Sequence, residues 1–220
     1  MPRIARGLAD NHIYHILNRG NGGLEVFNRI GDYKSFIALI YEAKEEFDIR
    51  IFSYCLMPNH FHLVLMPIKA EHLSKMMQWV LTSHVRRYHG YHQTSGHIWQ
   101  GRYKSFLIQE DNHLLTVMRY VEANPVRAGL VKSAKAWHWS SHREWIRITP
   151  RTLVDPCPIE LPEDWNRFVN QPLTEQELDD IHQSIMRNRP FGSEEWQLQM
   201  CRSLGLESTL RPRGRPRRRR

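Results

Sequence analysis

The fold is decided by residues 49–66, which read IRIFSYCLMPNHFHLVLM. Two β-rich apolar runs, 49–57 and 60–66, flank Pro58-Asn59, a dipeptide typical of tight turns. Two strands with so short a connection pair as an antiparallel hairpin. The second run is apolar apart from its histidines, so we expect this hairpin to be buried.

Segments on either side extend the hairpin into an alternation of strands and helices. Two more strands are predicted over residues 12–18 and 103–108. Apolar residues at helical spacing predict helices over residues 32–47, 71–89 and 111–124. Asp32 can cap the first of these helices, and Pro125 disfavours helix at the residue before it, which ends the third. The order matches the ferredoxin-like split βαβ plan with one added helix, so the sequence predicts an α+β fold with an antiparallel sheet and helices on one face.

The C-terminal third of the chain has a different composition. Prolines are frequent after residue 150, Thr174-Glu175-Gln176-Glu177 is a capping-box pattern, and Ser193 can cap a further helix. Arginine and proline dominate the last ten residues and predict disorder there. We therefore divide the chain into a body at 1–145, a Pro-rich linker at 146–173, a helical hairpin at 174–206 and an Arg-rich tail at 207–220.

The net charge of +8 conceals three unlike parts. Residues 1–140 hold 17 Lys and Arg against 11 Asp and Glu, residues 141–210 hold 7 against 12, and residues 211–220 hold seven arginines and no acid. A basic body with a bare arginine tail fits nucleic acid, an anionic membrane surface or an acidic partner. No apolar run approaches the length of a membrane span, and three distant cysteines predict reduced thiols in the cytoplasm.

Two histidines stand two residues apart in the second strand of the hairpin. Alternate side chains of a strand project from the same face, so we expect His60 and His62 to point the same way. Two imidazoles on a rigid strand can hold one divalent metal ion. The spacing alone decides little, because one buried and one solvated histidine fit it equally well. The apolar surroundings favour the metal site, since buried polar rings need partners.

A second constellation lies near residue 120. In the predicted third helix, Tyr120 and Asn124 are four residues apart and share a face. A tyrosine hydroxyl, with an ordinary pKa of roughly 10, is a weak nucleophile that becomes useful beside a metal ion that polarises a phosphate. The amide of Asn124 would offer an oxygen as a third ligand. The same residues also fit a half-buried tyrosine and an asparagine that ends a helix.

Basic and aromatic residues alternate in the body, a pattern that suits phosphate contact and base stacking and also fits a solvated basic face. The residues concerned are Arg86, Arg87, Arg102, Tyr103 and Lys104. Residues 212–216, PRGRP, form the core of an AT-hook, whose arginines favour the narrow minor groove of A/T-rich DNA. The expected contacts there are Arg213, Arg215 and Arg217. A tail that binds by charge alone is the alternative.

These motifs together resemble a known family. Residues 57–65, MPNHFHLVL, resemble the histidine–hydrophobic–histidine strand of the Y1, or HUH, transposases, and residues 120–131, YVEANPVRAGLV, resemble their tyrosine helix. Residues 14–21, YHILNRGN, residues 189–196, RPFGSEEW, and the run from 206 into the tail are typical of one branch, the REP-associated tyrosine transposases of bacteria. That branch is related to the IS200/IS605 transposases, and the resemblance covers nearly the whole chain.

The resemblance implies a metal-dependent enzyme that cleaves and rejoins single-stranded DNA near a hairpin formed by a short palindromic repeat. His60 and His62 would bind Mg²⁺ or Mn²⁺, and Tyr120 would form a 5′-phosphotyrosine. Asn124 stands where related insertion-sequence transposases carry a glutamine, which leaves the third ligand open. Further DNA contacts are expected at Arg19 and Asn21, within the matched segment 14–21, and at Arg119, which directly precedes the matched segment 120–131.

The resulting expectation is a monomer in the bacterial cytoplasm, associated with the nucleoid, that binds hairpin-bearing single strands and, through its tail, A/T-rich duplex. A dimeric insertion-sequence transposase is one alternative, although the C-terminal extension argues against it. Another is a domesticated DNA-binding protein whose catalytic residues are vestigial. A zinc hydrolase ranks last, because the chain lacks a general-base motif such as His-Glu-x-x-His.

Overall fold

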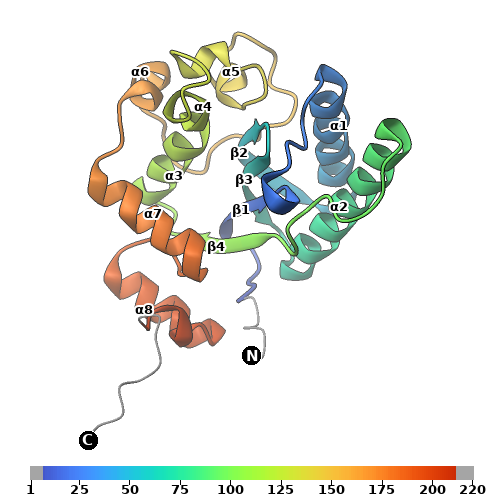
Figure 1. The fold of residues 1–220 in the computed structure, drawn as a ribbon. Helices are drawn as coiled ribbons and strands as arrows, with labels where there is room; N and C mark the ends of the chain where they lie inside the picture. Colours follow the sequence, from blue (N-terminus) through green and yellow to red (C-terminus); the bar gives the residue numbers. More distant parts are fainter. Residues whose placement is uncertain (1–6, 212–220) are drawn as a thin grey trace, which may run out of the picture.

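The computed structural model describes residues 7–211, which form a four-stranded sheet between helices (Figure 1). The strands are β1 (Ile13–Arg19), β2 (Ile49–Met57), β3 (His60–Pro67) and β4 (Lys104–Ile108). Their order across the sheet is β2-β3-β1-β4, and all neighbouring strands are antiparallel. The predicted α+β fold with a ferredoxin-like sheet is confirmed. Each predicted strand is present with ends within one residue of the expectation.

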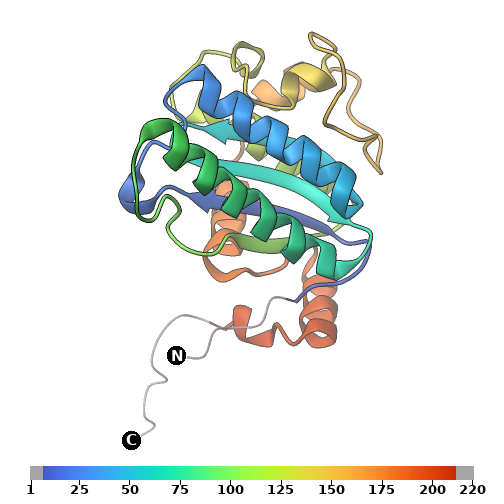
Figure 2. The ribbon, with the colours of Figure 1, turned by 90° about the vertical axis from the view of Figure 1, so that its right-hand side faces the viewer.

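The two crossover helices cover one face of the sheet. α1 (Ile30–Phe47) and α2 (Ala70–His92) lie side by side across it (Figure 2). Their apolar sides pack on alternate residues of β3, with the rings of Phe36 and Phe61 centred 5.0 Å apart. Burying one such side chain contributes roughly 1.5–3 kcal/mol. Within residues 7–211, no helix combines the length and apolar character that a membrane crossing requires.

The opposite face carries α3 (Asn112–Glu122), so helices lie on both faces of the sheet and not on one face as the sequence predicts. The end of α3 also departs from the sequence prediction. The helix expected to run through Asn124 ends at Glu122, and a separate short helix, α4 (Asn124–Arg127), follows. Pro125 is the cause, because a proline interrupts the hydrogen bonding of a continuing helix but suits the first turn of a new one. Tyr120 and Asn124 therefore lie on consecutive helices.

The segment predicted as a Pro-rich linker, 146–173, packs on the body. It contains α6 (Trp165–Asn170), which lies against α3 (Figure 1), and the side chains of Leu153 and Trp165 are buried. Prolines stop helices and strands but do not prevent burial, so their frequency misled the prediction. The short elements η2 (Ala134–Ala136) and α5 (His142–Trp145) precede this segment on the same side of the sheet.

Two helices complete the described chain, and both have the caps that the sequence predicts. α7 (Glu175–Arg187) begins at a capping box of Thr174 and Glu177, and α8 (Glu194–Leu204) begins at Ser193, whose hydroxyl accepts from the backbone of Trp196. The sequence predicts that these helices pair with each other. In the structure α7 packs beside β4, and α8 packs against η3 (Glu207–Thr209).

Downstream segments occupy both edges of the sheet. Beyond β4, Phe191 donates its backbone N–H to the carbonyl of Leu107 at 2.8 Å and accepts from the N–H of Gln109 at 2.9 Å. Beyond β2, the N–H of Ser141 donates to the carbonyl of Tyr54 at 2.9 Å. Some outer backbone groups of both edge strands therefore find partners within the same chain.

A buried histidine on α2 makes stability depend on pH. His84 is 2% exposed, packs between Phe36 and Trp99, and has no hydrogen-bond partner for Nδ1 among the described residues. Burial lowers the pKa of His84 to about 4, whereas an unfolded histidine titrates near ~6.5. As the pH falls between these values the unfolded chain takes up the proton first, which costs the folded state about 1.4 kcal/mol per pH unit.

The variant His84→Phe removes this titration and should lack its share of the pH dependence. Urea unfolding of both proteins at several pH values gives the difference in their unfolding free energies, in which other titrating groups cancel. We expect the wild type to lose stability relative to His84→Phe as the pH falls, by about 1.4 kcal/mol per pH unit between the two pKa values. Parallel curves from neutral pH into this acidic range would contradict the prediction.

Candidate active site

β3 presents two histidines to the side of the sheet that α3 covers. His60 and His62 project from the same face, as their spacing predicts, with ring centroids 4.9 Å apart. His62 is 3% exposed, and His60 is partly exposed at the start of the strand. The turn residue Asn59 fixes His60, because its Oδ1 lies 2.6 Å from His60 Nδ1. That contact leaves His60 Nε2 on the far side of the ring.

The tyrosine and the asparagine meet this pair. α3 places the Tyr120 ring edge-on to His62, with centroids 5.8 Å apart. α4 places Asn124 Nδ2 2.8 Å from His62 Nε2. Tyr120 is 5% exposed and Asn124 is also buried. The other three candidate residues therefore lie around His62.

Burial keeps the histidine pair neutral. It lowers the pKa of His60 to about 4, with a further contribution from the positive charges of Arg19 and Arg127. Burial also lowers the pKa of His62 well below its usual 6.5. A neutral imidazole has a lone pair to offer, and this is the form that binds a metal ion. The pair therefore suits the role of ligands.

Arg127 is a site residue that sequence reasoning did not single out. Its guanidinium carbon lies 4.0 Å from the centroid of the Tyr120 ring, and Nη1 donates to the Tyr120 carbonyl at 3.1 Å. Burial raises the pKa of Tyr120, and the positive charge of Arg127 opposes that rise. Since the deprotonated phenol is the stronger nucleophile, Arg127 favours the reactive form. Its place in the matched segment 120–131 was the available signal.

A third histidine also escaped the sequence analysis. His15 on β1 is fully buried, and its Nε2 lies 2.8 Å from His62 Nδ1. β1 pairs with β3 so that His15 lies opposite Val64, which puts its side chain on the same face as His62. Its place in the matched segment 14–21 was the available signal, but only the strand order could have shown that it lies against His62.

Several predicted DNA-contacting residues lie at the same end of the sheet. Arg19 is exposed and lies opposite His60 in the β1–β3 register, and Asn21 follows it in η1 (Asn21–Gly23). The Asn18 amide donates to the carbonyl of Gly101 at 3.1 Å, so the loop before β4 runs beside these residues. That loop and the start of β4 carry Arg102 and Lys104, which are exposed. Tyr103 between them is buried, with its hydroxyl 3.4 Å from that of Ser74 on α2, so the prediction that it contacts DNA needs correction.

Two predicted contacts lie on the other side of the sheet. Arg86 and Arg87 are exposed on α2, and Arg87 forms an ion pair with Glu42 of α1 at 3.1 Å. The sheet therefore separates both arginines from the histidine pair. The predicted tail contacts Arg213, Arg215 and Arg217 lie outside the described residues.

The prediction for Arg119 needs correction. Its side chain is buried in an ion pair with Glu177 of α7, and its guanidinium carbon lies 4.8 Å from the ring centroid of Phe168. Consecutive residues of an α-helix point about 100° apart, so Arg119 does not share the face of Tyr120. This arginine joins α3 to the C-terminal helices and does not present an exposed charge to DNA.

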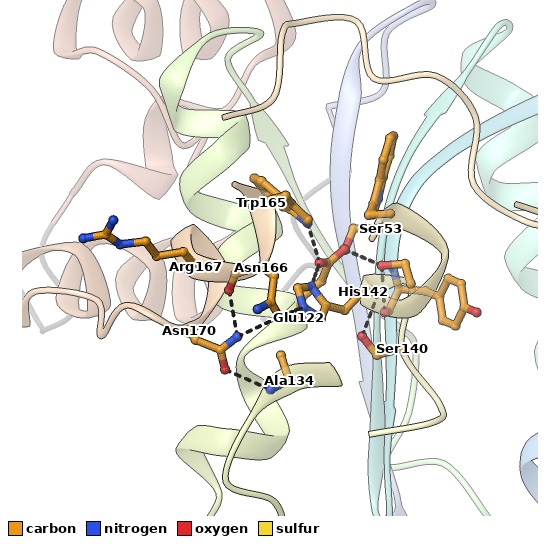
Figure 3. A network of polar contacts seen from close by, with 12 residues as sticks. Ser53, Glu122, Ala134, Ser140, His142, Trp165, Asn166, Arg167 and Asn170 are labelled. Carbon is orange, nitrogen blue, oxygen red and sulfur yellow. Dashed lines mark hydrogen bonds and ion pairs between the residues drawn. The ribbon is translucent and has the colours of Figure 1, made fainter. Parts of the chain in front are cut away.

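A buried carboxylate anchors the helix that carries Tyr120 (Figure 3). Glu122 is fully buried, with Oε2 2.8 Å from His142 Nδ1 and accepting from Trp165 Nε1 at 2.9 Å. Its Oε1 accepts from the hydroxyl of Ser53 at 3.2 Å. Burial lowers the pKa of His142, but the hydrogen bond and charge of Glu122 outweigh burial, so the pKa is raised. α3 is thereby tied to β2, α5 and α6.

The donor set fits a divalent ion if Asn124 takes part. Within the described residues, no three His, Cys, Asp or Glu side chains gather so as to hold an ion. Two neutral imidazoles and an amide oxygen are suitable ligands in chemical terms. The Asn124 amide already reaches His62 Nε2, and half a turn of the amide exchanges its nitrogen for its oxygen.

Comparison with known proteins agrees with this geometry. The family described as Transposase IS200 like matches residues 9–124, slightly more than half of the chain. The chain belongs to this family of DNA-cleaving and strand-transferring enzymes. It is similar to a protein of Haemophilus influenzae described as a REP-associated tyrosine transposase, with 29% identity over 126 residues that cover 51% of this chain and 71% of the relative.

A solved structure also shares the fold. It is a REP-associated tyrosine transposase bound to a REP hairpin, with a TM-score of 0.57 and 17% identity, covering 73% of this chain and 95% of that one. Both relatives bear the name of the branch that the sequence motifs resemble. The Y1 transposase family recognised from the sequence is confirmed by the family match over residues 9–124, and the solved structure confirms the fold.

Proposed function

We propose that the chain is a metal-dependent, site-specific endonuclease and strand transferase for single-stranded DNA, with Tyr120 as its nucleophile. The observation that carries this proposal is the gathering of Tyr120, Asn124 and the histidine pair around one point. A hydroxyl nucleophile beside ligands for a divalent ion suits phosphoryl transfer. A domain that only binds DNA needs neither.

The proposed substrate is single-stranded DNA next to the hairpin of a short palindromic repeat. A REP hairpin is bound in the solved relative, which supports this choice. Arg19, which lies opposite His60 in the β1–β3 register, offers exposed positive charge near the site, suited to backbone phosphates. The arginine tail is proposed to contact A/T-rich duplex by a salt-dependent interaction.

Cleavage would proceed by in-line attack of the Tyr120 oxygen on the scissile phosphorus. The new P–O bond forms as the bond to the 3′ oxygen breaks, and the phenol proton is transferred, in net terms, to that leaving oxygen. The products are a 5′-phosphotyrosine and a free 3′-OH. Because the phosphodiester energy is conserved, attack by another 3′-OH rejoins strands without ATP. Water as the nucleophile would only hydrolyse the strand.

His60, His62 and Asn124 would hold the divalent ion. When bound, the ion supplies neutralisation of charge on the scissile phosphate and the leaving oxygen. Imidazole ligands suit Mn²⁺ better than Mg²⁺, which prefers oxygen. We therefore use Mn²⁺ as the test ion, and the proposal includes both Mn²⁺ and Mg²⁺.

Covalent trapping tests the proposed reaction. The wild-type protein, Mn²⁺ and an oligonucleotide that carries a REP-like hairpin should give a protein–DNA adduct that survives denaturation. Peptide mapping should place the DNA on the peptide that contains Tyr120, and EDTA should prevent the reaction. An adduct on another residue, or cleavage without an adduct, would contradict the mechanism. A protein with vestigial catalysis would bind the hairpin and leave it intact.

We also propose that one chain supplies the whole site. The Glu122 network that fixes α3 to β2, α5 and α6 of its own chain supports this arrangement. An equal mixture of His62→Ala and Tyr120→Phe should therefore form no more adduct than either variant alone. A dimer that exchanged tyrosine helices would combine the histidines of one chain with the tyrosine of the other. Recovered adduct in the mixture, together with a dimeric mass in solution, would favour the insertion-sequence alternative.

A further inference from the structure

His15 lies against His62, and it has no role in the proposed cleavage reaction. Its ring lies between those of His62 and Phe106, at centroid distances of 5.0 and 4.8 Å. Nε2 is 2.8 Å from His62 Nδ1, whereas Nδ1 has no hydrogen-bond partner in the part of the chain that the structure describes. A fully buried imidazole with one nitrogen committed to a proposed metal ligand calls for an explanation beyond packing.

The hydrogen bonds around His62 lead to one arrangement of protons. Both rings lie buried side by side, and a neutral imidazole carries one N–H, either on Nδ1 or on Nε2. Asn124 Nδ2 donates to His62 Nε2, which must then be the nitrogen without hydrogen. His62 Nδ1 therefore carries the hydrogen and donates it to His15 Nε2. His15 is the acceptor, and its own hydrogen lies on Nδ1.

We propose that His15 is a positioning residue that holds His62 in the tautomer protonated on Nδ1, so that the lone pair of Nε2 points toward Asn124, where the ion would bind. The proposal rests on the proposed function of this site. A group that donated to His62 Nδ1 would shift the hydrogen to Nε2 and block the ligand atom. Carboxylates and carbonyl oxygens commonly orient metal-binding histidines in this way. An imidazole acceptor does the same without adding negative charge.

A packing role makes a different prediction. If His15 only filled the space beside Phe106, a phenyl ring of similar size would replace it without consequence for His62. The variant His15→Phe keeps the ring but cannot accept a hydrogen bond, whereas His15→Gln can place an amide oxygen near the position of Nε2. The control is His84→Phe, the same change at another buried histidine, across the sheet from His62.

Two measurements on these proteins test the proposal. In the metal-free protein, ¹⁵N NMR of the histidine rings reports the tautomer of His62, and calorimetric titration with Mn²⁺ reports the affinity of the site. We expect His15→Phe to lose the pure Nδ1-protonated tautomer and to bind Mn²⁺ about 10–100-fold more weakly. His15→Gln and His84→Phe should stay close to the wild type in both measurements. Circular dichroism verifies folding, and His15→Leu serves if the phenylalanine variant does not fold.

Three results would overturn the positioning role. The first is an unchanged His62 tautomer and Mn²⁺ affinity in His15→Phe, and the second is an equal loss of affinity in His84→Phe. The third is a failure of His15→Gln to restore either property. If the wild type binds no Mn²⁺, the proposed metal site fails, and the spectra of the metal-free protein still decide whether His15 sets the tautomer.

Discussion

Replacing Tyr120 by phenylalanine should abolish the covalent protein–DNA adduct and leave hairpin binding intact. The change removes one oxygen, the proposed nucleophile, and keeps the ring that packs against His62 and Arg127. Loss of a covalent nucleophile costs on the order of 10³-fold or more in rate, so we expect no detectable adduct. Denaturing gels with Mn²⁺ and the hairpin oligonucleotide measure the adduct, and fluorescence anisotropy measures binding.

Tyr88→Phe is the matched control for this experiment. Tyr88 is buried on α2, across the sheet from His62, and its ring stacks on His92 at 4.2 Å. Removing the same atom there should leave adduct formation at the wild-type level. An adduct that persists in Tyr120→Phe would exclude Tyr120 as the nucleophile, although the family assignment would stand.

The largest loss of stability is expected from Glu122→Ala. The change leaves His142 buried without its counter-charge and removes the acceptor of Trp165 Nε1. Breaking a buried ion pair from one side costs about 3–5 kcal/mol, which urea unfolding at neutral pH would reveal. Because Glu122 fixes the helix that carries Tyr120, adduct formation per folded molecule should fall as well. A change in unfolding free energy below 1 kcal/mol, roughly that of an exposed pair, would contradict this account.

Glu122→Gln separates the charge of this residue from its shape. The pKa of His142 is raised, so its stabilising contribution is complete below the unfolded value of about 6.5 and is lost as the pH rises through the folded pKa. Glutamine keeps an oxygen for Trp165 but provides no negative charge for His142. The variant should therefore show no decrease in stability as the pH rises above ~6.5, because protonated His142 no longer contributes to it. Identical pH dependence in the two proteins would show that the pair is not ionic.

The sheet and its crossover helices could be predicted because their signals are local. Alternation of apolar residues, the Pro58-Asn59 turn and helical spacing each act over a few residues, and the strands accordingly fall where expected. The common orientation of His60 and His62 follows from the same alternation. The tyrosine helix ends at Glu122 and not at Asn124 as predicted, because Pro125 interrupts one helix and suits the first turn of the next.

The remaining features depend on contacts between distant segments. His15 reaches His62 only because β1 lies between β3 and β4 in the sheet. The sequence does not distinguish Arg119 from Arg19. In the structure Arg119 is buried in an ion pair with Glu177 of α7, whereas the side chain of Arg19 is exposed. Composition therefore predicted the presence of nucleic-acid contacts but could not distinguish an available charge from one used inside the fold.

The hydrogen-bonded edges of the sheet affect whether two copies of this enzyme can pair through their sheets. An open edge strand is a template on which another chain can add a strand, and this route leads to sheet-to-sheet dimers and to aggregation. Here the backbone of Phe191 covers β4 and that of Ser141 covers β2. At these positions another chain could pair with the sheet only after Phe191 or Ser141 had moved away, so segments that follow the tyrosine helix protect part of each edge from other copies.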